Sequence, residues 1–584
     1  MTRRSARRRI ALSALLLVAI LGTFLIRLVD IQVVHADALN AQAEDKRSIP
    51  QVILGERGDI FDSTGVLLAD SVLRYDITAS PKYAVTSTDV PPETAAEQLA
   101  PIVGVPAAKL VKVLRDAVAE NPDSDYAYLA KKVDAQQFEQ VRALGIPWVY
   151  YEAHAGRTYP NGAVAGNLLG FVGSQNEAQA GVELADDSCL AGTDGSEVYE
   201  RSADDVRIPG STVVTTPAVD GRDLILTIDR DLQWFVQQTL ASYAKKFGAK
   251  WGTVVVQEVK SGKLLAVADY PSVDPNNVNA TVQSPDPALG SRAFTAPFEP
   301  GSTFKTLTAA SLLDARLVTP ATHVLAPYRF TTPDGADVND SEYHGDMSLT
   351  LTGVLKESSN TGLSQLGLRM TPEQRYAYMR AFGLGARTEV DFGAEATGDL
   401  NSGPDWDAQS NLATMFGQGL TVTAVQMASI YQTIGNGGVR LPVSLVAGCR
   451  LADGTLTDTP ATEGTRVISA TAARETVDML ENVATKGWLA DQVAIPGYRL
   501  ATKTGTAQQP DGHGGYTKSY LVSLAGIAPA DDPQYVVSVS LADPVKMNTS
   551  GAAAPIFHDV TTQVLKQFGV VPSGSSSPDL PTNY

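Results

Sequence analysis

The start of the chain holds one continuous apolar block, with no charged residue from position 10 to position 26. Beyond Arg27 the block continues for two more apolar residues. At about 1.5 Å per residue, a helix of this length approaches the thickness of a membrane's hydrocarbon layer. The pattern therefore predicts a transmembrane anchor at residues 10–29, preceded by a basic tail at residues 1–9.

The basic tail sets the expected orientation of this anchor. Positive residues beside a membrane helix stay in the cytoplasm, so we expect a single-pass protein of the cell membrane whose remaining chain lies outside. A cleaved signal peptide is the alternative, because Ala36-Asp37-Ala38 resembles a cleavage site. The apolar block exceeds a usual signal core, however, and Arg27 and Asp30 separate it from these alanines. The tail arginines are Arg3, Arg4, Arg7, Arg8 and Arg9.

Beyond the anchor, helix-like and strand-like patterns alternate, which predicts a mixed α and β chain. An alanine-rich polar stretch indicates a short stalk within residues 30–47. Residues 62–65 form a turn between two apolar stretches, as in a β-hairpin. Residues 91–144 are predicted to be mostly helical, because apolar residues recur at steps of three and four, as at Leu110 and Leu114.

A change of pattern near residues 217–222 marks the start of a second folded unit. The segments after it predict a strand, a helix and a two-stranded hairpin, at residues 223–229, 231–246, 251–257 and 263–268. The end of the chain is rich in Pro, Ser and Gly, which is typical of a disordered tail. We therefore predict a non-catalytic module at residues 48–220, a second unit at residues 221–568 and a disordered tail at residues 569–584.

Composition narrows the possible functions. The chain has 584 residues, too many for one hydrophobic core. Its net charge of -18 argues against a nucleic-acid partner, because phosphate binding needs clustered Lys and Arg. The six histidines show no metal-binding spacing, so we expect neither a metal nor a cofactor. The location outside the membrane permits a disulfide between Cys189 and Cys449, but we favour two buried thiols.

Three short polar motifs stand in a fixed order along the second unit. They are Ser302-Thr303-Phe304-Lys305, Ser358-Ser359-Asn360 and Lys503-Thr504-Gly505-Thr506. Together they supply a serine, a lysine to take its proton, a polar clamp and a cationic strand edge, which suits attack on an amide through an acyl-enzyme. Each motif alone is weak, since Ser242-Tyr243-Ala244-Lys245 repeats the first spacing. The prediction therefore depends on the ordered set.

The first motif is predicted to begin a helix, because residues 299–301 break regular structure just before it. The free N–H groups of a helix start favour developing negative charge, and Lys305 lies on the same helix face as Ser302. Lys305 acts as a base only when it is neutral, and lowering its pKa from about 10.4 to near 7 requires about 4.6 kcal/mol. Burial and a second cation, Lys503, are the expected causes of this shift.

The third motif ends a predicted strand. Gly505 is expected to leave room for a substrate backbone, which would pair with the strand edge as an added strand. Thr504 and Thr506, with the charged Lys503 behind them, suit a terminal carboxylate. The backbone N–H groups of Ser302 and Thr506 form the expected oxyanion hole.

The second motif follows an apolar-periodic stretch at residues 349–355. The Ser358 hydroxyl is predicted to relay a proton between Lys305 and a leaving amine. The Asn360 side chain is predicted to hydrogen-bond a substrate amide on both of its edges.

These motifs resemble those of the penicillin-binding proteins and serine β-lactamases. The whole chain is similar to the class B penicillin-binding proteins, which implies an α+β protein with a membrane anchor and two domains. An elongated mixed pedestal, or dimerisation, domain is implied at residues 48–220, and a transpeptidase domain with a β-lactamase-like antiparallel sheet flanked by helices at residues 221–568. Further stretches that carry the resemblance are Arg57-Gly58-Asp59-Ile60, Gly181-Val182-Glu183, Gly192-Thr193-Asp194-Gly195, Gly417-Gln418-Gly419-Leu420, Asn436-Gly437-Gly438 and Ala554-Pro555-Ile556-Phe557.

The resemblance implies a peptidoglycan D,D-transpeptidase. Ser302 would form an acyl-enzyme from a D-Ala-D-Ala stem peptide, D-alanine would leave, and an amine of a neighbouring strand would resolve the ester. β-Lactams would acylate the same serine, and a D,D-carboxypeptidase side activity is possible. The implied catalytic residues are Ser302, Lys305, Ser358, Asn360 and Lys503, and the implied substrate-binding residues are Thr504, Gly505 and Thr506.

Two stretches most resemble the septal enzymes of cell division, namely residues 349–355 and residues 497–499. This implies a polytopic glycosyltransferase and other division proteins as partners. A side-wall elongation enzyme, and a β-lactam sensor or scaffold with little catalysis, are the alternatives. Ser63 departs from the family by replacing an arginine common in the pedestal motif, and Thr306 replaces a proline common after the active-site lysine.

Overall fold

The chain folds into two compact units. They are Met1–Glu56 with Gly192–Gly221, and Arg57–Ala191 with Arg222–Tyr584. The computed structural model describes residues 3–38, 48–173, 176–200, 208, 210–284, 287–401, 406–510 and 515–584. Residues 39–47, which are half of the predicted stalk, lie outside the described residues.

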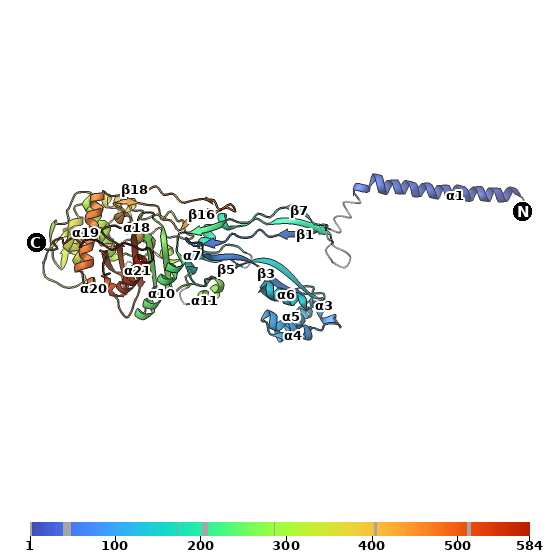
Figure 1. Cartoon of the computed structure of the whole chain (residues 1–584), viewed down its shortest axis with the longest axis horizontal. Coiled ribbons are helices and arrows are strands. Elements are labelled where there is room, and N and C mark those ends of the chain that lie inside the picture. The colour runs from blue at the N-terminus through green and yellow to red at the C-terminus, as the bar shows by residue number, and fades with distance from the viewer. Residues whose placement is uncertain are drawn as a thin grey trace. The chain divides into compact units, whose positions relative to one another are not determined.

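The first unit contains a long N-terminal helix and a small antiparallel sheet (Figure 1). Helix α1 (Arg3–Val29) continues into a π-helical turn at Asp30–Val34. Residues Arg7–Val34 are long and apolar enough to cross a membrane, and no second such stretch occurs in the described part of the chain. This agrees with the predicted anchor. The sheet has the order β1-β6-β7, from β1 (Ser48–Ile53), β6 (Gly195–Glu200) and β7 (Val213–Thr216).

A seven-stranded mixed sheet begins the second unit, with the order β17-β16-β8-β2-β3-β4 and with β5 paired to β3. The helices within residues 81–143 pack around Trp148 and Phe138 in a small separate core, whereas those within residues 166–190 join the large core of the second unit. The strands are β2 (Ile60–Phe61), β3 (Leu67–Ala79), β4 (Ala127–Val133), β5 (Val149–Thr158), β8 (Asp223–Leu226), β16 (Val446–Arg450) and β17 (Leu456–Thr457). The helices are α3 (Pro81–Thr86), α4 (Pro92–Val103), α5 (Ala107–Glu120), α6 (Ala135–Ala143), α7 (Gly166–Leu169), α8 (Gly181–Ala185) and α9 (Asp187–Leu190).

The predictions for this region hold at the level of elements. Residues 91–144 are mostly helical, with β4 as the exception, and Leu110 and Leu114 are buried. The turn of the predicted hairpin is held by Asp62, whose Oδ1 accepts the N–H groups of Thr64 and Val66, both at 2.8 Å. This side chain closes the turn between β2 and β3 because an Asp carboxylate can bond its own backbone two residues on.

Two buried arginines of this region share one carboxylate. Arg57 Nε and Arg157 Nε each lie 2.7 Å from an oxygen of Glu183, and all three side chains are almost fully buried. Arg57 also donates to Asp187 Oδ1 at 2.5 Å. The glutamate therefore neutralises charge that would otherwise be stranded in the core.

The central feature of the second unit is a five-stranded antiparallel sheet with the order β10-β9-β21-β20-β19. Helices α10 and α21 cover one face, α18 and α19 lie against the other, and α13 packs against α19. Successive side chains of β9 point to opposite faces of the sheet. Val254 and Val256 join the core beneath α10 and α21, whereas Val255 joins the core beneath α18 and α19. The strands are β9 (Trp251–Glu258), β10 (Leu264–Tyr270), β19 (Ala501–Pro510), β20 (Tyr516–Ala528) and β21 (Tyr535–Ala542).

Further helices and short strands surround this sheet. The α-helices are α10 (Arg230–Phe247), α11 (Val278–Val282), α12 (Arg292–Thr295), α13 (Lys305–Asp314), α14 (Leu351–Glu357), α15 (Asn360–Gly367), α16 (Pro372–Ala381), α17 (Ala408–Ala413), α18 (Ala424–Gly435), α19 (Ala470–Lys486), α20 (Ala490–Val493) and α21 (Ala554–Gln567). The 3₁₀ turns are η2 (Pro275–Asn277), η3 (Gly301–Phe304), η5 (Thr414–Phe416) and η6 (Ser550–Ala552). The short strands are β11 (His323–Ala326), β12 (Arg329–Thr331), β13 (Asp337–Asn339), β14 (Met347–Thr350), β15 (Val439–Arg440) and β18 (Thr465–Arg466).

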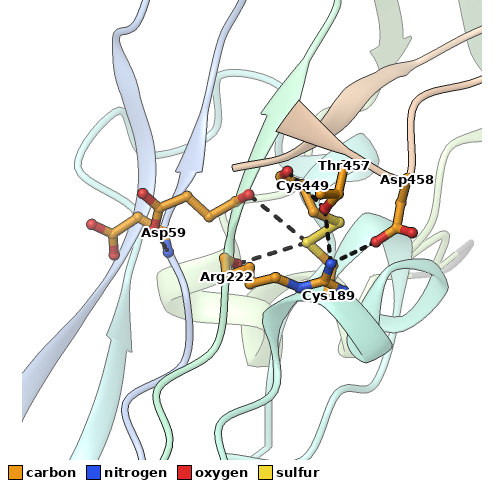
Figure 2. Close-up of a disulfide and its surroundings, with 7 residues drawn as sticks. Asp59, Cys189, Arg222, Cys449, Thr457 and Asp458 are labelled. Atoms are coloured by element: carbon orange, nitrogen blue, oxygen red, sulfur yellow. Dashed lines mark hydrogen bonds and ion pairs between the residues drawn. A yellow bond between two sulfur atoms is a disulfide. The ribbon is translucent and has the colours of Figure 1, made fainter. Parts of the chain in front are cut away.

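The two cysteines form a disulfide, so the prediction of two free thiols is wrong. Cys189 in α9 bonds Cys449 in β16, across 260 residues of sequence (Figure 2). The pairing of β16 with β8 brings them together, because Cys449 stands opposite Leu224 and the Arg222 N–H donates to Cys189 O at 2.9 Å. The sequence spacing alone contains no sign of that strand pairing.

The end of the chain follows a defined path, contrary to the predicted disordered tail at residues 569–584. Backbone groups of Pro578, Leu580, Pro581 and Thr582 hydrogen-bond to α19 and to the start of α14. Composition misled the prediction because Pro and Ser disfavour helix and strand, whereas the bonds that hold this segment come from elements distant in sequence.

Candidate active site

Ser302 lies in the 3₁₀ turn η3, immediately before helix α13. It is half-buried, and the residues around it are buried. Gly301 has a φ of +58°, and a Cβ there would lie 3.0 Å from Ala507 Cβ and 3.1 Å from Thr506 O. Glycine therefore lets the turn that carries the serine pack directly onto β19, the strand of the third motif.

Lys305 is the first residue of α13 and is fully buried. Its Nζ donates to Ser358 O and lies 3.4 Å from Ser358 Oγ. Lys503 Nζ donates to the same Ser358 Oγ at 2.9 Å. Lys305 of the first motif and Lys503 of the third motif therefore both lie within hydrogen-bond reach of the Ser358 hydroxyl of the second.

Burial lowers the pKa of Lys305 to about 7, while the nearby Asp340 carboxylate opposes the shift. Burial and then repulsion from Lys305 hold the pKa of Lys503 well below its usual value. A pKa of about 7 supports the expectation that Lys305 can be neutral, and it identifies the physical cause. That cause is loss of solvation, and the expected contribution of Lys503 is not among the causes. The expectation of a charged Lys503 is not met either, because burial and Lys305 lower the pKa of Lys503.

Ser358 holds a strained conformation at the end of α14, with φ +58° and ψ 36°. Residues other than glycine adopt this region only when their surroundings require it, and such strain gathers at active sites. In this conformation the Ser358 carbonyl accepts from Lys305, and the Ser358 hydroxyl lies within reach of both lysines.

The third motif lies on β19, which is the edge strand of the central sheet. Lys503 is buried, Thr504 is half-buried and Thr506 is exposed. An open edge next to exposed threonine side chains suits an extended substrate, as predicted. Thr506 Oγ1 also lies 3.2 Å from Ser550 Oγ, a residue that the motif analysis did not identify.

Gly505 also has a packing role inside the protein, which the sequence analysis did not predict. A Cβ at this position would lie 2.4 Å from Ser523 Oγ and 3.0 Å from both Pro300 O and Thr303 Cγ2. The glycine therefore makes room for the turn that holds Ser302, and a contact of Gly505 with a substrate stays a prediction. Both glycines of the site serve the contact between η3 and β19.

Asn360 begins α15, and part of its amide is already used inside the protein. Its Nδ2 donates to Asn339 O at 2.9 Å, so only the amide oxygen and the remaining N–H are free for a substrate. The prediction that the Asn360 amide contacts a substrate on both edges is therefore narrowed, because one N–H of Nδ2 already holds the side chain in place.

Asp340 is a buried residue that holds the second motif and was missed in the sequence. Its Oδ1 accepts the N–H groups of Asn360 and Thr361, and its Oδ2 accepts Ser359 Oγ–H at 2.7 Å. His344 Nε2 lies 2.9 Å from the same Oδ2. No local spacing identifies this carboxylate, because it reaches the motif from a loop twenty residues earlier.

Glu299 is a second missed residue, three positions before Ser302. Its Oε1 accepts the Gly419 N–H at 3.0 Å and the Tyr516 hydroxyl at 3.3 Å, while Oε2 is buried without a partner. Burial raises the pKa of Glu299 to about 7. A carboxyl beside the first motif was visible in the sequence, but only as part of a helix-breaking stretch.

Two family comparisons agree with this geometry. Residues 252–562 match the penicillin binding protein transpeptidase domain, and residues 52–226 match the penicillin-binding protein dimerisation domain. This chain is a class B penicillin-binding protein. The first match contains all three motifs of the site, and the second contains the buried arginine pair.

Relatives of this penicillin-binding protein align along almost its whole length. PbpB of Mycolicibacterium smegmatis is 34% identical over 97% of this chain and 91% of its own. The peptidoglycan D,D-transpeptidase FtsI of Escherichia coli is 31% identical over 94% of this chain and 90% of its own.

Solved structures give the same picture of the fold. A peptidoglycan synthetase from Bifidobacterium adolescentis superposes with a TM-score of 0.72 and 31% identity, covering 92% of this chain and 100% of that one. Penicillin binding protein 3 of Mycobacterium tuberculosis, complexed with aztreonam, gives a TM-score of 0.70 and 28% identity over 91% and 100% of the two chains.

Proposed function

We propose that this class B penicillin-binding protein is a serine peptidoglycan D,D-transpeptidase that cross-links stem peptides. One observation carries the proposal, which is the convergence of Lys305 Nζ and Lys503 Nζ on Ser358 Oγ beside the turn of Ser302. This set can activate a serine and hold an anionic substrate end in one pocket.

In acylation, Ser302 Oγ attacks the carbonyl between the two D-alanines. Neutral Lys305 takes the serine proton, and the N–H groups of Ser302 and Thr506 stabilise the oxyanion. Ser358 passes the proton from Lys305 to the departing amine, so the C–N bond breaks and D-alanine leaves. An ester on Ser302 and a neutral Lys305 result.

In the second half, an amine of a neighbouring stem peptide attacks this ester. Lys305 takes the amine's proton and returns it to Ser302 Oγ as the C–O bond breaks, which leaves a new amide and the free enzyme. A β-lactam opens its ring on Ser302, but its amine stays tethered and blocks the place of the acceptor.

The substrate lies as an added strand along β19. Its terminal carboxylate meets the hydroxyls of Thr504 and Thr506 with Lys503 behind them, and the free part of the Asn360 amide bonds the peptide. The incoming carboxylate would favour protonation of Lys503, so binding separates a charged Lys503 from a neutral Lys305.

The septal role and the position in the cell are part of the same proposal. We place residues 1–9 in the cytoplasm, the anchor at residues 10–29 and the pedestal and catalytic domains, residues 48–220 and 221–568, outside the membrane. The name of the Escherichia coli relative supports peptidoglycan cross-linking, and we propose division proteins, including a polytopic glycosyltransferase, as partners.

A labelled β-lactam tests the catalytic proposal. Intact-mass analysis of the protein should show one covalent adduct, and peptide mapping should place it on Ser302. The Ser302→Ala variant should show none. The proposal would be contradicted if the wild type formed no adduct, or if the variant formed as much adduct as the wild type.

A further inference from the structure

A segment outside the motifs connects two of the three elements that carry them. This segment, residues 573–584, is called the strap below. It begins beside the chain that enters β19, where the Ser573 N–H donates to Gly497 O at 2.8 Å and the Arg499 N–H donates to Ser573 Oγ at 3.0 Å. Arg499 also donates to Ser575 Oγ at 2.8 Å. The strap therefore starts at the base of the strand that holds Lys503.

The strap then crosses α19. The side chain of Asn482, which is fully buried, donates to Pro578 O at 3.1 Å and accepts the Leu580 N–H at 3.2 Å. Asp579 forms an ion pair with Lys486 of the same helix. Because α19 packs against both β19 and α14, the strap follows the helix that lies between them.

The last residues of the strap contact Thr350, the N-cap residue just before α14. The Thr350 N–H donates to Thr582 O at 3.0 Å, and Thr350 Oγ1 donates to Pro581 O at 2.6 Å. The ring of Tyr584 stacks on His323 in the neighbouring strand β11, with 3.9 Å between the ring centres. Three contacts thus hold the start of one short helix.

At the opposite end of α14 lies Ser358, whose hydroxyl belongs to the proposed catalytic set. Helix α14 has seven residues, too few to be stable on its own, and its N-cap is Thr350, which accepts the Gly353 N–H at 3.1 Å. It ends at Ser358, whose strained backbone depends on its surroundings. Any shift at the first turn of a helix this short is passed to Ser358.

We propose that the strap is a positioning element of the reaction, which fixes α14 relative to β19 so that Ser358 Oγ stays within hydrogen-bond reach of both lysines. The strap contacts Thr350, Gly353 of α14 and Asn482 of α19, so it acts on Ser358 through these two helices. The proposal rests on the function proposed above, because it assigns the strap a part in acylation of Ser302.

Gly353 offers a way to move the strap without cutting it. A Cβ at this position would lie 1.9 Å from Thr582 O, and the next atom outside the strap, Leu349 Cδ2, lies at 3.3 Å. Gly353→Ala must therefore displace the strap in the full chain. In a chain that ends at residue 572 the same substitution meets only a flexible leucine, and alanine favours a helix more than glycine does.

The test compares four full-length or shortened proteins in detergent: wild type, Gly353→Ala, the chain ending at residue 572, and that chain with Gly353→Ala. Stopped-flow acylation with a fluorescent β-lactam gives the acylation rate constant and the non-covalent dissociation constant separately. We expect Gly353→Ala and the shortened chain each to lose about tenfold or more in the rate constant. The dissociation constant should stay within about twofold, and the combined variant should be no slower than the shortened chain alone.

Tyr584→Ala and Tyr584→Phe are the matched pair if the shortened chain fails to fold. Phenylalanine keeps the ring on His323 and should acylate at the wild-type rate, whereas alanine should be slower. An unchanged rate constant in a folded shortened chain, or an equal loss from Gly353→Ala with and without the strap, would overturn the proposal. A wild type that is not acylated on Ser302 would instead overturn the proposed function.

Discussion

At the scale of single residues, the site depends on which of two neighbouring amines carries a proton. Lys305 and Lys503 both lie within reach of Ser358 Oγ, and the Asp340 carboxylate favours the charged form of Lys305. A base must be neutral to accept a proton, so acidity and catalysis are directly linked here.

Acylation should therefore depend on pH around neutrality. Burial lowers the pKa of Lys305 to about 7, so the amine is charged and inactive below this pH and becomes a base as the pH rises through it. We expect the second-order rate constant for a β-lactam to rise through a midpoint near 7. A flat profile between pH 5.5 and pH 8.5 would contradict a Lys305 base.

Replacing Asp340 should change both the midpoint and the rate. Asp340→Asn removes the charge that favours protonated Lys305, so the midpoint should move to lower pH. It also weakens the hold on the second motif, and the maximal rate should fall by about tenfold. The control is Asp337→Asn in the adjoining strand, an exposed carboxylate paired with Arg329, which should leave both quantities unchanged.

Removing the carboxylate that the two buried arginines share should destabilise the pedestal domain. Glu183→Ala leaves Arg57 and Arg157 buried without their shared carboxylate, which should lower the free energy of unfolding by about 3–5 kcal/mol. Urea unfolding of the protein measures this. Asp337→Ala breaks an exposed ion pair instead and should leave the urea midpoint nearly unchanged.

At the scale of elements, the site is a contact between the turn η3 and the strand β19. The glycines at this contact leave space for close packing inside the protein, because a Cβ added at Gly505 would lie 3.0 Å from both Pro300 O and Thr303 Cγ2. The motif spacing therefore reflects how two elements pack as well as what the substrate needs.

Gly505→Ala should disturb this contact and suppress acylation, because the new Cβ would lie 2.4 Å from Ser523 Oγ on the paired strand β20 and 3.0 Å from Pro300 O beside η3. Ser523→Ala removes that oxygen and should leave acylation of the otherwise native chain close to normal. The two changes together should recover part of the lost rate, since Pro300 O still lies 3.0 Å away. Labelled β-lactam incorporation over time measures all three, and no recovery in the double variant would contradict the packing argument.

The helices and strands were predicted well from the sequence, whereas contacts between residues distant in sequence were predicted only in part. Periodicity placed α10, β9 and β10 nearly to the residue, and the order of three motifs was enough to foresee a lysine pair beside Ser358. Asp340 was missed because its role comes from a contact across the fold, with no spacing to reveal it. The path of residues 573–584 was missed for the same reason, since composition cannot identify Asn482 and Thr350 as partners.

At the scale of the whole molecule, one disulfide links the segment that matches the dimerisation domain to the segment that matches the transpeptidase domain. Cys189 lies in the region of the dimerisation domain, and Cys449 lies within the transpeptidase match. Arg222 supports the same junction, donating to Thr457 Oγ1 at 2.9 Å and to Asp458 Oδ2 at 2.6 Å (Figure 2).

Reducing this bond should lower stability at the junction. Closing a loop of 260 residues restricts the unfolded chain, and loss of a native disulfide typically costs about 2–5 kcal/mol. Thermal unfolding of the wild type should therefore shift to lower temperature with a reductant. The variant with Cys189→Ala and Cys449→Ala should unfold at that lower temperature in both conditions, and a wild type indifferent to the reductant would contradict the prediction.

The same bond has a consequence for how the protein is made. Cys189 leaves the ribosome 260 residues ahead of Cys449, so the crosslink closes only after most of the catalytic domain has been synthesised. A cytosolic expression host keeps thiols reduced and would supply a molecule that lacks this crosslink. Drug-binding assays on material from such a host would describe an immature form of the enzyme.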